Sequence, residues 1–213
     1  MGSQRSKVEV KGFEAKHYDL LMGLLTLGQY NRWIRKAVRD TGAGKGWNVA
    51  ELGSGTGIAA CEFSRLIGEG RYIGLDIGEE MMMKAEKRCR KRSNVEFIKQ
   101  RIEQPFKLPF QADLFFMSFV MHGLENPDKE KVLENVRKNL QEGGLFGVLD
   151  YSQMKYSEAF WLARWIIWKL ECPLAGEFAE MGFPGFVESR GFKLLKVNKY
   201  FRGMFSLYLF KKV

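Results

Sequence analysis

Cysteine, histidine and long apolar runs are scarce in this chain, and the scarcity excludes several classes of protein. Three cysteines stand among 213 residues, at positions 61, 89 and 172, and no pair has the spacing of a metal-ligand motif. That usage predicts a reduced, cytoplasmic protein without a metal site. No run approaches the ~20 apolar residues that cross a bilayer, and residues 1–7 lack the apolar segment of a signal peptide.

What remains is the composition of a globular protein with a basic surface. Hydrophobic residues make up 46% of the chain and charged residues 28%, which excludes broad disorder. Lysine and arginine number 34 against 25 acidic residues, so the net charge is +9. The basic run Lys84–Arg92 is typical of a solvated helix face, and binding of an anionic membrane or RNA stays open as the alternative.

The hydrophobic pattern alternates between short apolar runs and amphipathic stretches. Strands are predicted at residues 47–52, 71–76, 94–99, 112–118 and 145–150, and helices at 58–67, 79–92 and 129–140, ending at Gly143-Gly144. Two last strands, 192–200 and 204–210, are joined by Arg202-Gly203, so they must run antiparallel. The prediction is an α/β fold: a seven-stranded, mostly parallel sheet with a C-terminal antiparallel hairpin and helices on both faces.

One domain is expected over residues 1–213. It comprises an N-terminal helical cap (13–40), a cofactor-binding core (47–153), an aromatic insert (154–190) and the terminal hairpin (191–213). The insert contains an aromatic helix near 156–170 with three of the five tryptophans. A buried packing helix, a lid over an apolar substrate and a contact with a membrane or a second subunit are three open interpretations of it.

A glycine-rich turn follows the first predicted strand, and an acidic residue ends the second. The turn is Gly53-Ser54-Gly55-Thr56-Gly57, preceded by Glu51, and the acid is Asp76. Glycines let the backbone approach a ligand closely, and the next helix offers free N–H groups at its N-terminus. An acid at the end of strand two can accept both hydroxyls of a ribose, so the pattern predicts an adenosine cofactor.

Nicotinamide dinucleotides are the competing cofactors. The G-x-G-x-x-G spacing fails from Gly53 but passes from Gly55, with Ala60 as the small third residue. Tyr151 and Lys155 also have the spacing of the catalytic pair of short-chain dehydrogenases. Those enzymes need a serine about a dozen residues before the tyrosine, where this chain has Lys138-Asn139. The dehydrogenase interpretation is therefore the weaker one.

The motifs resemble those of class I S-adenosylmethionine-dependent methyltransferases, which have a Rossmann-like fold. Within that class they are most similar to the motifs of the ubiquinone/menaquinone-biosynthesis C-methyltransferases. The glycine turn with Asp76 and the L-x-P-G-G-like turn at 140–144 resemble the class. The segments at 18–33, 94–110 and 149–152 and the terminal hairpin resemble the quinone enzymes. Where that family has an F-G-I-R-N stretch after strand four, this chain has Phe119-Val120-Met121-His122-Gly123, and it has Arg101 in place of a common Asp.

The resemblance implies S-adenosylmethionine as the cofactor and assigns roles to its neighbours. Backbone around the glycine turn would hold the methionine part of the cofactor, and Asp76 would hold the ribose. Hydrophobic side chains and the segment near Ile102 would contact the adenine. Ser118 would lie under the sulfonium. Gln100 or Glu103 would replace the missing Asp. The implied cofactor residues are Glu51, Gly53, Ser54, Gly55, Gly57, Asp76, Ile77, Met81, Arg101, Ile102 and Ser118.

The methyl acceptor is expected to enter over the carboxyl ends of the strands. Candidate catalytic residues are His122, Tyr18 and Asp150, and candidate substrate contacts are His17, Tyr151, Trp161 and Trp165. We expect a small-molecule or lipid-like acceptor rather than nucleic acid, with quinone-like molecules first. A phospholipid or small-amine N-methyltransferase and a non-catalytic cofactor-binding module are the alternatives. Peripheral membrane contact and a homodimer stay open.

Overall fold

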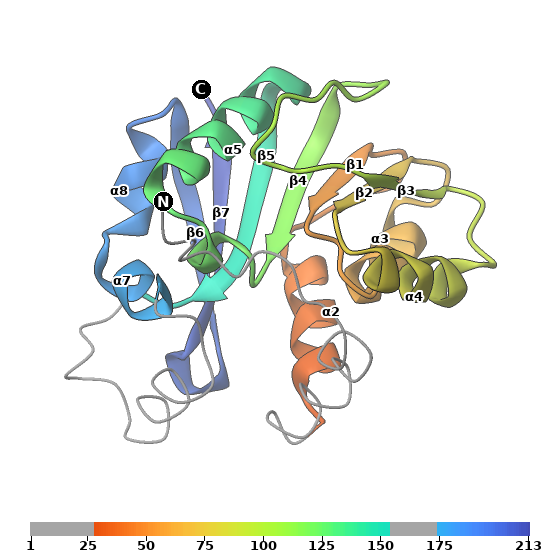
Figure 1. The fold of residues 1–213 in the computed structure, drawn as a ribbon, viewed down its shortest axis with the longest axis horizontal. Helices are drawn as coiled ribbons and strands as arrows, with labels where there is room; N and C mark the ends of the chain where they lie inside the picture. Colours follow the sequence, from red (N-terminus) through yellow and green to blue (C-terminus); the bar gives the residue numbers. More distant parts are fainter. Residues whose placement is uncertain (1–27, 154–173) are drawn as a thin grey trace, which may run out of the picture.

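A seven-stranded sheet forms the centre of the computed structural model, which describes residues 28–153 and 174–213 (Figure 1). The strand order is β3-β2-β1-β4-β5-β7-β6. The strands are β1 (Val49–Leu52), β2 (Tyr72–Asp76), β3 (Val95–Lys99), β4 (Ala112–Ser118), β5 (Leu140–Tyr151), β6 (Phe192–Tyr200) and β7 (Phe205–Lys212). β1 to β5 run parallel, while β7 lies antiparallel between β5 and β6. The predicted fold class is confirmed.

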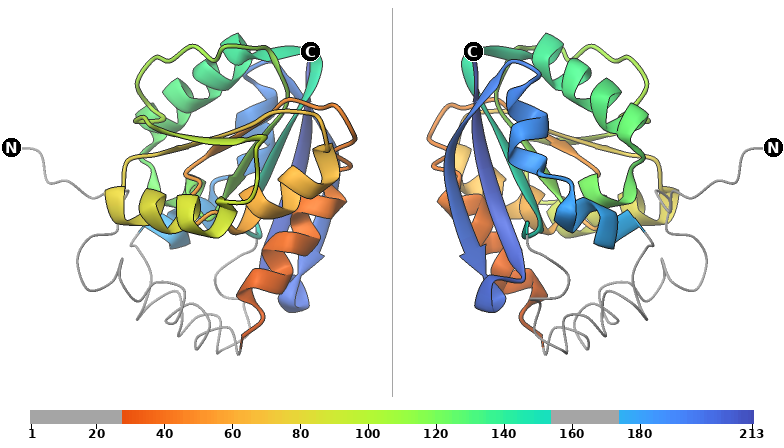
Figure 2. Two further views of the ribbon diagram at one scale, coloured as in Figure 1. Left: turned by 90° about the vertical axis from the view of Figure 1, so that its right-hand side faces the viewer. Right: turned by 90° about the vertical axis from the view of Figure 1, so that its left-hand side faces the viewer.

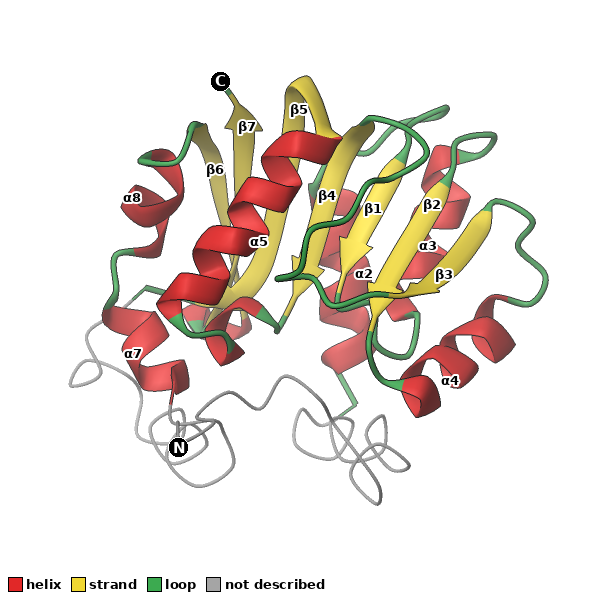
Figure 3. Ribbon diagram, turned by 45° about the horizontal axis from the view of Figure 1, so that its top comes forward, coloured by secondary structure: helices red, strands yellow, loops and turns green. Residues whose placement is uncertain are grey.

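Helices cover both faces of the sheet (Figure 2). The helices are α2 (Tyr30–Asp40), α3 (Ile58–Ile67), α4 (Glu79–Cys89), α5 (Asn126–Asn139), α7 (Leu174–Glu180) and α8 (Phe183–Glu188). In Figure 3, α5 crosses in front of β4 and β5, while α2 and α3 lie behind the sheet. The arrangement follows from the sequence alternation, because each connection between parallel strands must cross over one face of the sheet.

β4 lies in the middle of the sheet, and its side chains pack on both faces. Phe116 contacts Phe63 of α3 edge-to-face, with ring centroids 5.2 Å apart. Phe115 faces the other side, where Phe106 lies 6.5 Å away. Both phenylalanines of β4 are fully buried, as expected for an apolar strand covered on both faces. This core fixes the carboxyl end of β4, where functional residues follow.

The structure differs from the sequence prediction at several element boundaries; α4, for example, ends at Cys89 rather than at residue 92. α5 begins at Asn126 rather than 129, because Pro127 occupies the first turn, where its missing N–H is tolerated. β5 begins at Leu140, so Gly143-Gly144 lies inside a strand instead of ending a helix. The hairpin link is a 3₁₀ turn over Phe201–Gly203 rather than a two-residue turn.

Some predictions concern segments outside the described residues. These are the first part of the N-terminal cap, the aromatic helix near 156–170, and the four candidate residues His17, Tyr18, Trp161 and Trp165. Within the described part of the chain, no helix combines the length and the apolar character that crossing a membrane requires.

Candidate cofactor and active site

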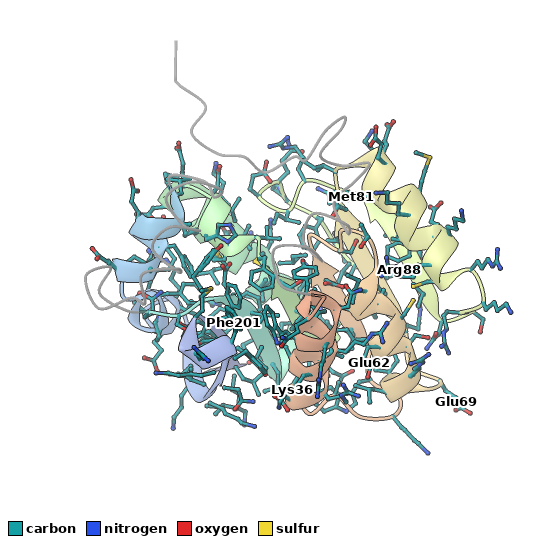
Figure 4. All side chains as sticks on the ribbon, turned by 90° about the horizontal axis from the view of Figure 1, so that it is seen from below. Lys36, Glu62, Glu69, Met81, Arg88 and Phe201 are labelled. Carbon is teal, nitrogen blue, oxygen red and sulfur yellow. The ribbon has the colours of Figure 1, made fainter. Side chains whose placement is uncertain are left out.

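A cleft opens at the carboxyl ends of β1, β2 and β4, where the strand order reverses between β1 and β4. Open α/β sheets bind ligands at such a switch point. The cleft encloses about 1070 Å³, including space open to solvent. Its lining residues are Tyr30, Ile34, Glu51, Gly53, Ser54, Gly55, Thr56, Ile58, Ala59, Asp76, Ile77, Gly78, Met81, Gln100, Ile102, Glu103, Ser118, Phe119, Val120, His122 and Gly123. Figure 4 looks onto this edge of the sheet, with Met81 labelled at the start of α4.

The glycine turn between β1 and α3 needs its glycines for different reasons. Gly53 has φ +71°, and a Cβ there would lie 2.5 Å from Cγ2 of Val120. Gly55 has φ +51° and no atom within 4 Å of the Cβ position, so its backbone is open to the cleft. Gly57 precedes α3 with φ +76°, and a Cβ there would lie 2.9 Å from Cβ of Ala85 in α4. Gly57 therefore serves helix packing, whereas Gly53 and Gly55 shape the cleft.

Asp76 at the end of β2 is held by two backbone donors. The N–H of Gly55 donates to Oδ2 at 2.7 Å, and the N–H of Gly78 donates to Oδ1 at 2.8 Å. A carboxylate has about four acceptor sites, so both oxygens keep capacity for ligand hydroxyls. The two bonds thus fix the carboxylate at the cleft while leaving it able to bind the two hydroxyls of a ribose.

Glu51 is a buried carboxyl group beneath the same cleft. Its side chain accepts a hydrogen bond from the hydroxyl of Tyr72 on β2. Burial raises the pKa of Glu51 to about 8, the Tyr72 bond opposes that rise, and the charge of Asp76 adds to it. A carboxyl group in this state favours a cationic partner, because a positive charge would stabilise its ionised form. The ammonium of a bound amino-acid moiety is such a partner.

Ser54 carries a buried hydroxyl next to the cleft. Its side chain is 5% exposed, and within the described residues its Oγ is the one buried side-chain polar atom without a hydrogen-bond partner. A buried hydroxyl left without a partner costs free energy, so such atoms mark places where a ligand or water completes the structure. Ser54 lines the cleft beside Glu51 and Asp76, while its Oγ lies below the cleft surface.

The segment after β3 forms the wall predicted to face adenine. Ile102 is buried, and the side-chain amide of Asn135 on α5 donates to its carbonyl at 2.9 Å and to that of Gln104 at 2.8 Å. Gln100 and Glu103, the two residues predicted to replace the missing Asp, both line the cleft. Arg101 does not line it, because its side chain is exposed and pairs with Glu103.

Phe119 follows β4 in a strained backbone conformation. Its φ is +55°, in the left-handed region that large side chains rarely adopt. The N–H of Phe119 donates to the carbonyl of Leu149 at 2.8 Å, which holds the turn against β5. Its ring lies 5.7 Å from that of Tyr30 on α2 and 5.0 Å from that of Phe205 on β7. The turn thereby places an aromatic wall on the cleft.

His122 and Asp150 form a hydrogen-bonded pair beside that wall. Nδ1 of His122 lies 2.8 Å from Oδ1 of Asp150, and Oδ2 accepts from the His122 N–H at 3.1 Å. Asp150 is fully buried, and His122 is 8% exposed and lines the cleft. With an ionised Asp150, Nδ1 carries the ring proton and Nε2 is the basic nitrogen. The pair is an imidazole oriented by a carboxylate.

Comparison with known proteins decides the family. Residues 3–178 match the ubiE/COQ5 methyltransferase family over most of the chain. The chain belongs to that family. The ubiE/COQ5 enzymes are class I S-adenosylmethionine-dependent methyltransferases, so the cofactor is the one for which the cleft has fitting groups.

Individual relatives agree with this membership. The ubiquinone/menaquinone biosynthesis C-methyltransferases UbiE of Escherichia coli and Klebsiella pneumoniae are 33% identical over 144 residues, covering 65% of this chain and 56% of theirs. The chain thus spans just over half the length of these curated relatives.

Solved structures of methyltransferases share the fold. A SAM dependent methyltransferase from Aquifex aeolicus has a TM-score of 0.68 at 22% identity, covering 92% of this chain and 96% of that one. The N-methyltransferase NodS from Bradyrhizobium japonicum WM9, in complex with S-adenosyl-L-homocysteine, has a TM-score of 0.61 at 16% identity, covering 86% of each chain.

Most of the residues predicted for a ubiE/COQ5 cofactor site meet at one cleft. The predicted residues that line it are Glu51, Gly53, Ser54, Gly55, Asp76, Ile77, Met81, Ile102, Ser118 and His122. Gly57 and Arg101 lie outside the lining, for the reasons given above. Asp150 and Tyr151 are buried behind His122, whose ring meets that of Tyr151 edge-to-face at 5.1 Å. Neither is among the residues that line the cleft.

Nine lining residues are absent from the candidates predicted from the sequence: Tyr30, Ile34, Thr56, Ile58, Ala59, Gly78, Phe119, Val120 and Gly123. The helical pattern of residues 30–38 and the position of Phe119 directly after a buried strand pointed toward some of them. Within residues 28–153 and 174–213, no group of three or more His, Cys, Asp or Glu side chains is placed to hold a metal ion.

Proposed function

We propose that this chain transfers the methyl group of S-adenosylmethionine to a carbon or oxygen atom of a small, apolar, quinone- or lipid-like acceptor. The observation that carries the proposal is the His122–Asp150 pair at the cleft, with 2.8 Å between Nδ1 and Oδ1. A carbon or oxygen nucleophile is weak until it loses a proton, so its methylation needs a base. A neutral amine needs none, which ranks N-methylation second.

The donor half of the cleft provides groups for each part of the cofactor. Bound S-adenosylmethionine supplies an electrophilic methyl group on a positively charged sulfur. In the proposed arrangement, Asp76 accepts the ribose hydroxyls and Glu51 stabilises the ammonium of the methionine part. The open backbone at Gly55 lets the ligand approach closely.

His122 moves the proton in this mechanism. Nε2 takes the proton of the acceptor as the acceptor attacks the methyl carbon, and the imidazolium that forms is stabilised by the buried carboxylate of Asp150. Asp150 also accepts from the backbone N–H groups of His122 and Tyr151, at 3.1 and 2.8 Å. Those bonds hold the carboxylate still, so the ring keeps one orientation. His122 is therefore the catalytic residue and Asp150 the positioning residue.

Apolar side chains around His122 support an apolar acceptor. Tyr30, Ile34, Phe119 and Val120 line the cleft on the side of β4 and α2. A wall of this kind excludes water from the transfer and binds an aromatic or aliphatic acceptor. The UbiE relatives are named for ubiquinone and menaquinone biosynthesis, and we extend the quinone-like acceptor class to this chain on that ground.

Isothermal titration with S-adenosylmethionine, S-adenosylhomocysteine and NAD(H) tests the cofactor. We expect micromolar binding of the first two and none of the third. Asp76→Ala is expected to lower the affinity about tenfold or more, because charge-assisted hydrogen bonds to the ribose are lost. Binding of NAD(H) alone would instead support a dehydrogenase.

Methyl-transfer assays with quinol and phenol acceptors test the chemistry. His122→Gln should lower kcat on the order of 10² to 10⁴-fold while the S-adenosylmethionine Kd stays within about twofold. Asp150→Asn should lower kcat as well and alter the pH profile, because it favours the other imidazole tautomer. Unchanged kcat in His122→Gln would refute the base. Amine methylation that survives the substitution would favour the N-methyltransferase, and binding without any product would favour a non-catalytic module.

A further inference from the structure

A second cleft, lined by positive charge, lies between α2, α3 and α4. It encloses about 1070 Å³, including space open to solvent. The described lining residues are Arg35, Ile58, Cys61, Arg65, Lys87, Arg88, Arg90, Lys91 and Arg92, with no carboxylate among them. Figure 4 shows Arg88 between α4 and α3. Such a lining concentrates small anions around whatever it surrounds.

Two cysteines meet at the floor of this basic cleft. Cys61 of α3 lines the cleft and is half-buried, while Cys89 at the end of α4 is 4% exposed. A hydrogen bond from Cys89, aided by the charges of Arg88, Arg92 and Arg65, lowers the pKa of Cys61 to about 7. The hydrogen bond with Cys61 and burial raise the pKa of Cys89. One thiol of the pair is thus accessible and readily ionised, and the other is held protonated beside it.

The same pair is joined to the glycine turn of the cofactor cleft. Sγ of Cys89 lies 3.7 Å from the carbonyl oxygen of Gly57, so its single S–H can donate either to that oxygen or to Sγ of Cys61. The N–H of Cys61 donates to the same oxygen at 3.3 Å. Ile58, the next residue after Gly57, lines both clefts. Any change at the two sulfurs therefore acts on the last residue of the turn.

We propose that Cys61 and Cys89 are a redox-active thiol pair that reacts with small anionic disulfides, such as oxidised glutathione, and that their oxidation weakens cofactor binding. The second half of this proposal rests on the proposed function, whereas the thiol chemistry stands without it. The basic cleft selects the reagent by charge, and the shared carbonyl of Gly57 links the sulfurs to the cofactor.

The chemistry takes place in two exchange steps. The Cys61 thiolate attacks one sulfur of oxidised glutathione, which forms a mixed disulfide and releases one glutathione thiolate. The Cys89 thiol then gives up its proton and attacks the Cys61 sulfur, which releases a second glutathione and leaves the Cys61–Cys89 disulfide. Two protein thiols are oxidised, and one glutathione disulfide is reduced to two thiols.

Oxidation would change the turn in two ways. A disulfide has no S–H, so the Gly57 carbonyl loses a donor. A disulfide also fixes the two Cα atoms at about 4.4–6.8 Å, so it would hold α3 and α4 at one separation at this point. Gly57 packs closely against α4, since a Cβ there would lie 2.9 Å from Ala85, so the separation of the two helices bears directly on the turn.

The test uses the full chain carrying Cys172→Ser, so that Cys61 and Cys89 are its only thiols. Oxidised glutathione and cystamine, a small cationic disulfide, are compared as reagents at equal concentration, with intact-mass measurement and non-reducing peptide mapping. We expect a Cys61–Cys89 disulfide to form. At low salt it should form about tenfold faster with oxidised glutathione than with cystamine, and this rate difference should shrink at high salt. Arg92→Gln should reduce that advantage, and exposed Lys45→Gln should not.

Two further variants assign the roles of the sulfurs. Cys89→Ser should stop at the mixed disulfide on Cys61, and Cys61→Ser should remain largely unreacted, because the buried Cys89 is poorly accessible. Equal rates for the two reagents, or no Cys61–Cys89 bridge, would overturn the proposal.

Titration of the reduced and oxidised proteins with S-adenosylmethionine tests the link to the cofactor. Oxidation should lower the affinity at least about tenfold, reversibly with dithiothreitol. A disulfide that forms without changing the affinity would overturn this link. Binding by the reduced protein tests the proposed function separately, since it does not depend on the thiols being oxidised.

Discussion

Replacing Glu51 with Gln should remove a specific pH dependence of stability. Burial raises the pKa of this carboxyl group from 4.5 to about 8. Between those values the folded protein holds a proton that the unfolded chain releases, so this group makes the free energy of unfolding fall as the pH rises. Each pKa unit corresponds to about 1.4 kcal/mol, which gives a loss of about 3 to 4 kcal/mol between pH 5 and pH 8.

Chemical denaturation of the cofactor-free protein at several pH values measures this effect. The wild type should lose stability relative to Glu51→Gln as the pH rises, by the amount above, or roughly 10 °C in Tm for a chain of this size. Tyr72→Phe should extend the loss of stability to higher pH, because the Tyr72 hydrogen bond lowers the pKa of Glu51 in the wild type and its removal raises that pKa. Exposed Glu69→Gln is the control for removing one carboxylate. Parallel curves for wild type and Glu51→Gln would refute the buried, protonated carboxyl.

Two further substitutions test the walls of the cofactor cleft. Gly53→Ala should cost about 3 kcal/mol of stability, since φ is +71° and the new Cβ would lie 2.5 Å from Val120. Adding Val120→Ala should recover part of the lost stability in thermal melts. If the double variant melts no higher than Gly53→Ala alone, the steric explanation is wrong. Asn135→Ala should cost about 2 kcal/mol of stability, because the carbonyls of Ile102 and Gln104 lose their hydrogen-bond donor. The substitution should also weaken cofactor binding in titrations. An unchanged affinity would contradict the proposal that the segment around Ile102 contacts the adenine.

The sheet and the donor half of the cleft could be predicted from the sequence because local patterns encode them. The turn 53–57 and Asp76 lie at ends of apolar runs, and parallel strands bring such ends together. The backbone bonds from Gly55 and Gly78 to Asp76 are the structural result. Element boundaries are harder to predict where signals conflict. Gly143-Gly144 is typical of a helix end, yet Leu140 already pairs with β4, and the two glycines lie in the irregular stretch before pairing resumes at Leu145.

The acceptor side was less predictable because tertiary packing creates it. Nothing in the sequence links His122 to Asp150, which lies 28 residues later; parallel pairing of β4 with β5 brings them together. The wall formed by Tyr30 and Phe119 depends on how α2 crosses the sheet, and no local pattern encodes that crossing. The pairing of Cys61 with Cys89 likewise requires two helices to meet.

The reversal of strand order between β1 and β4 has a consequence for how this protein can diversify. Most groups proposed to hold the donor come from residues 51–103, on one side of the reversal. The groups proposed for the acceptor flank that stretch, with Tyr30 and Ile34 before it and Phe119 and the His122–Asp150 pair after it. One acceptor can therefore be exchanged for another by substitutions in the flanking segments while the central donor segment stays unchanged, in evolution or by design.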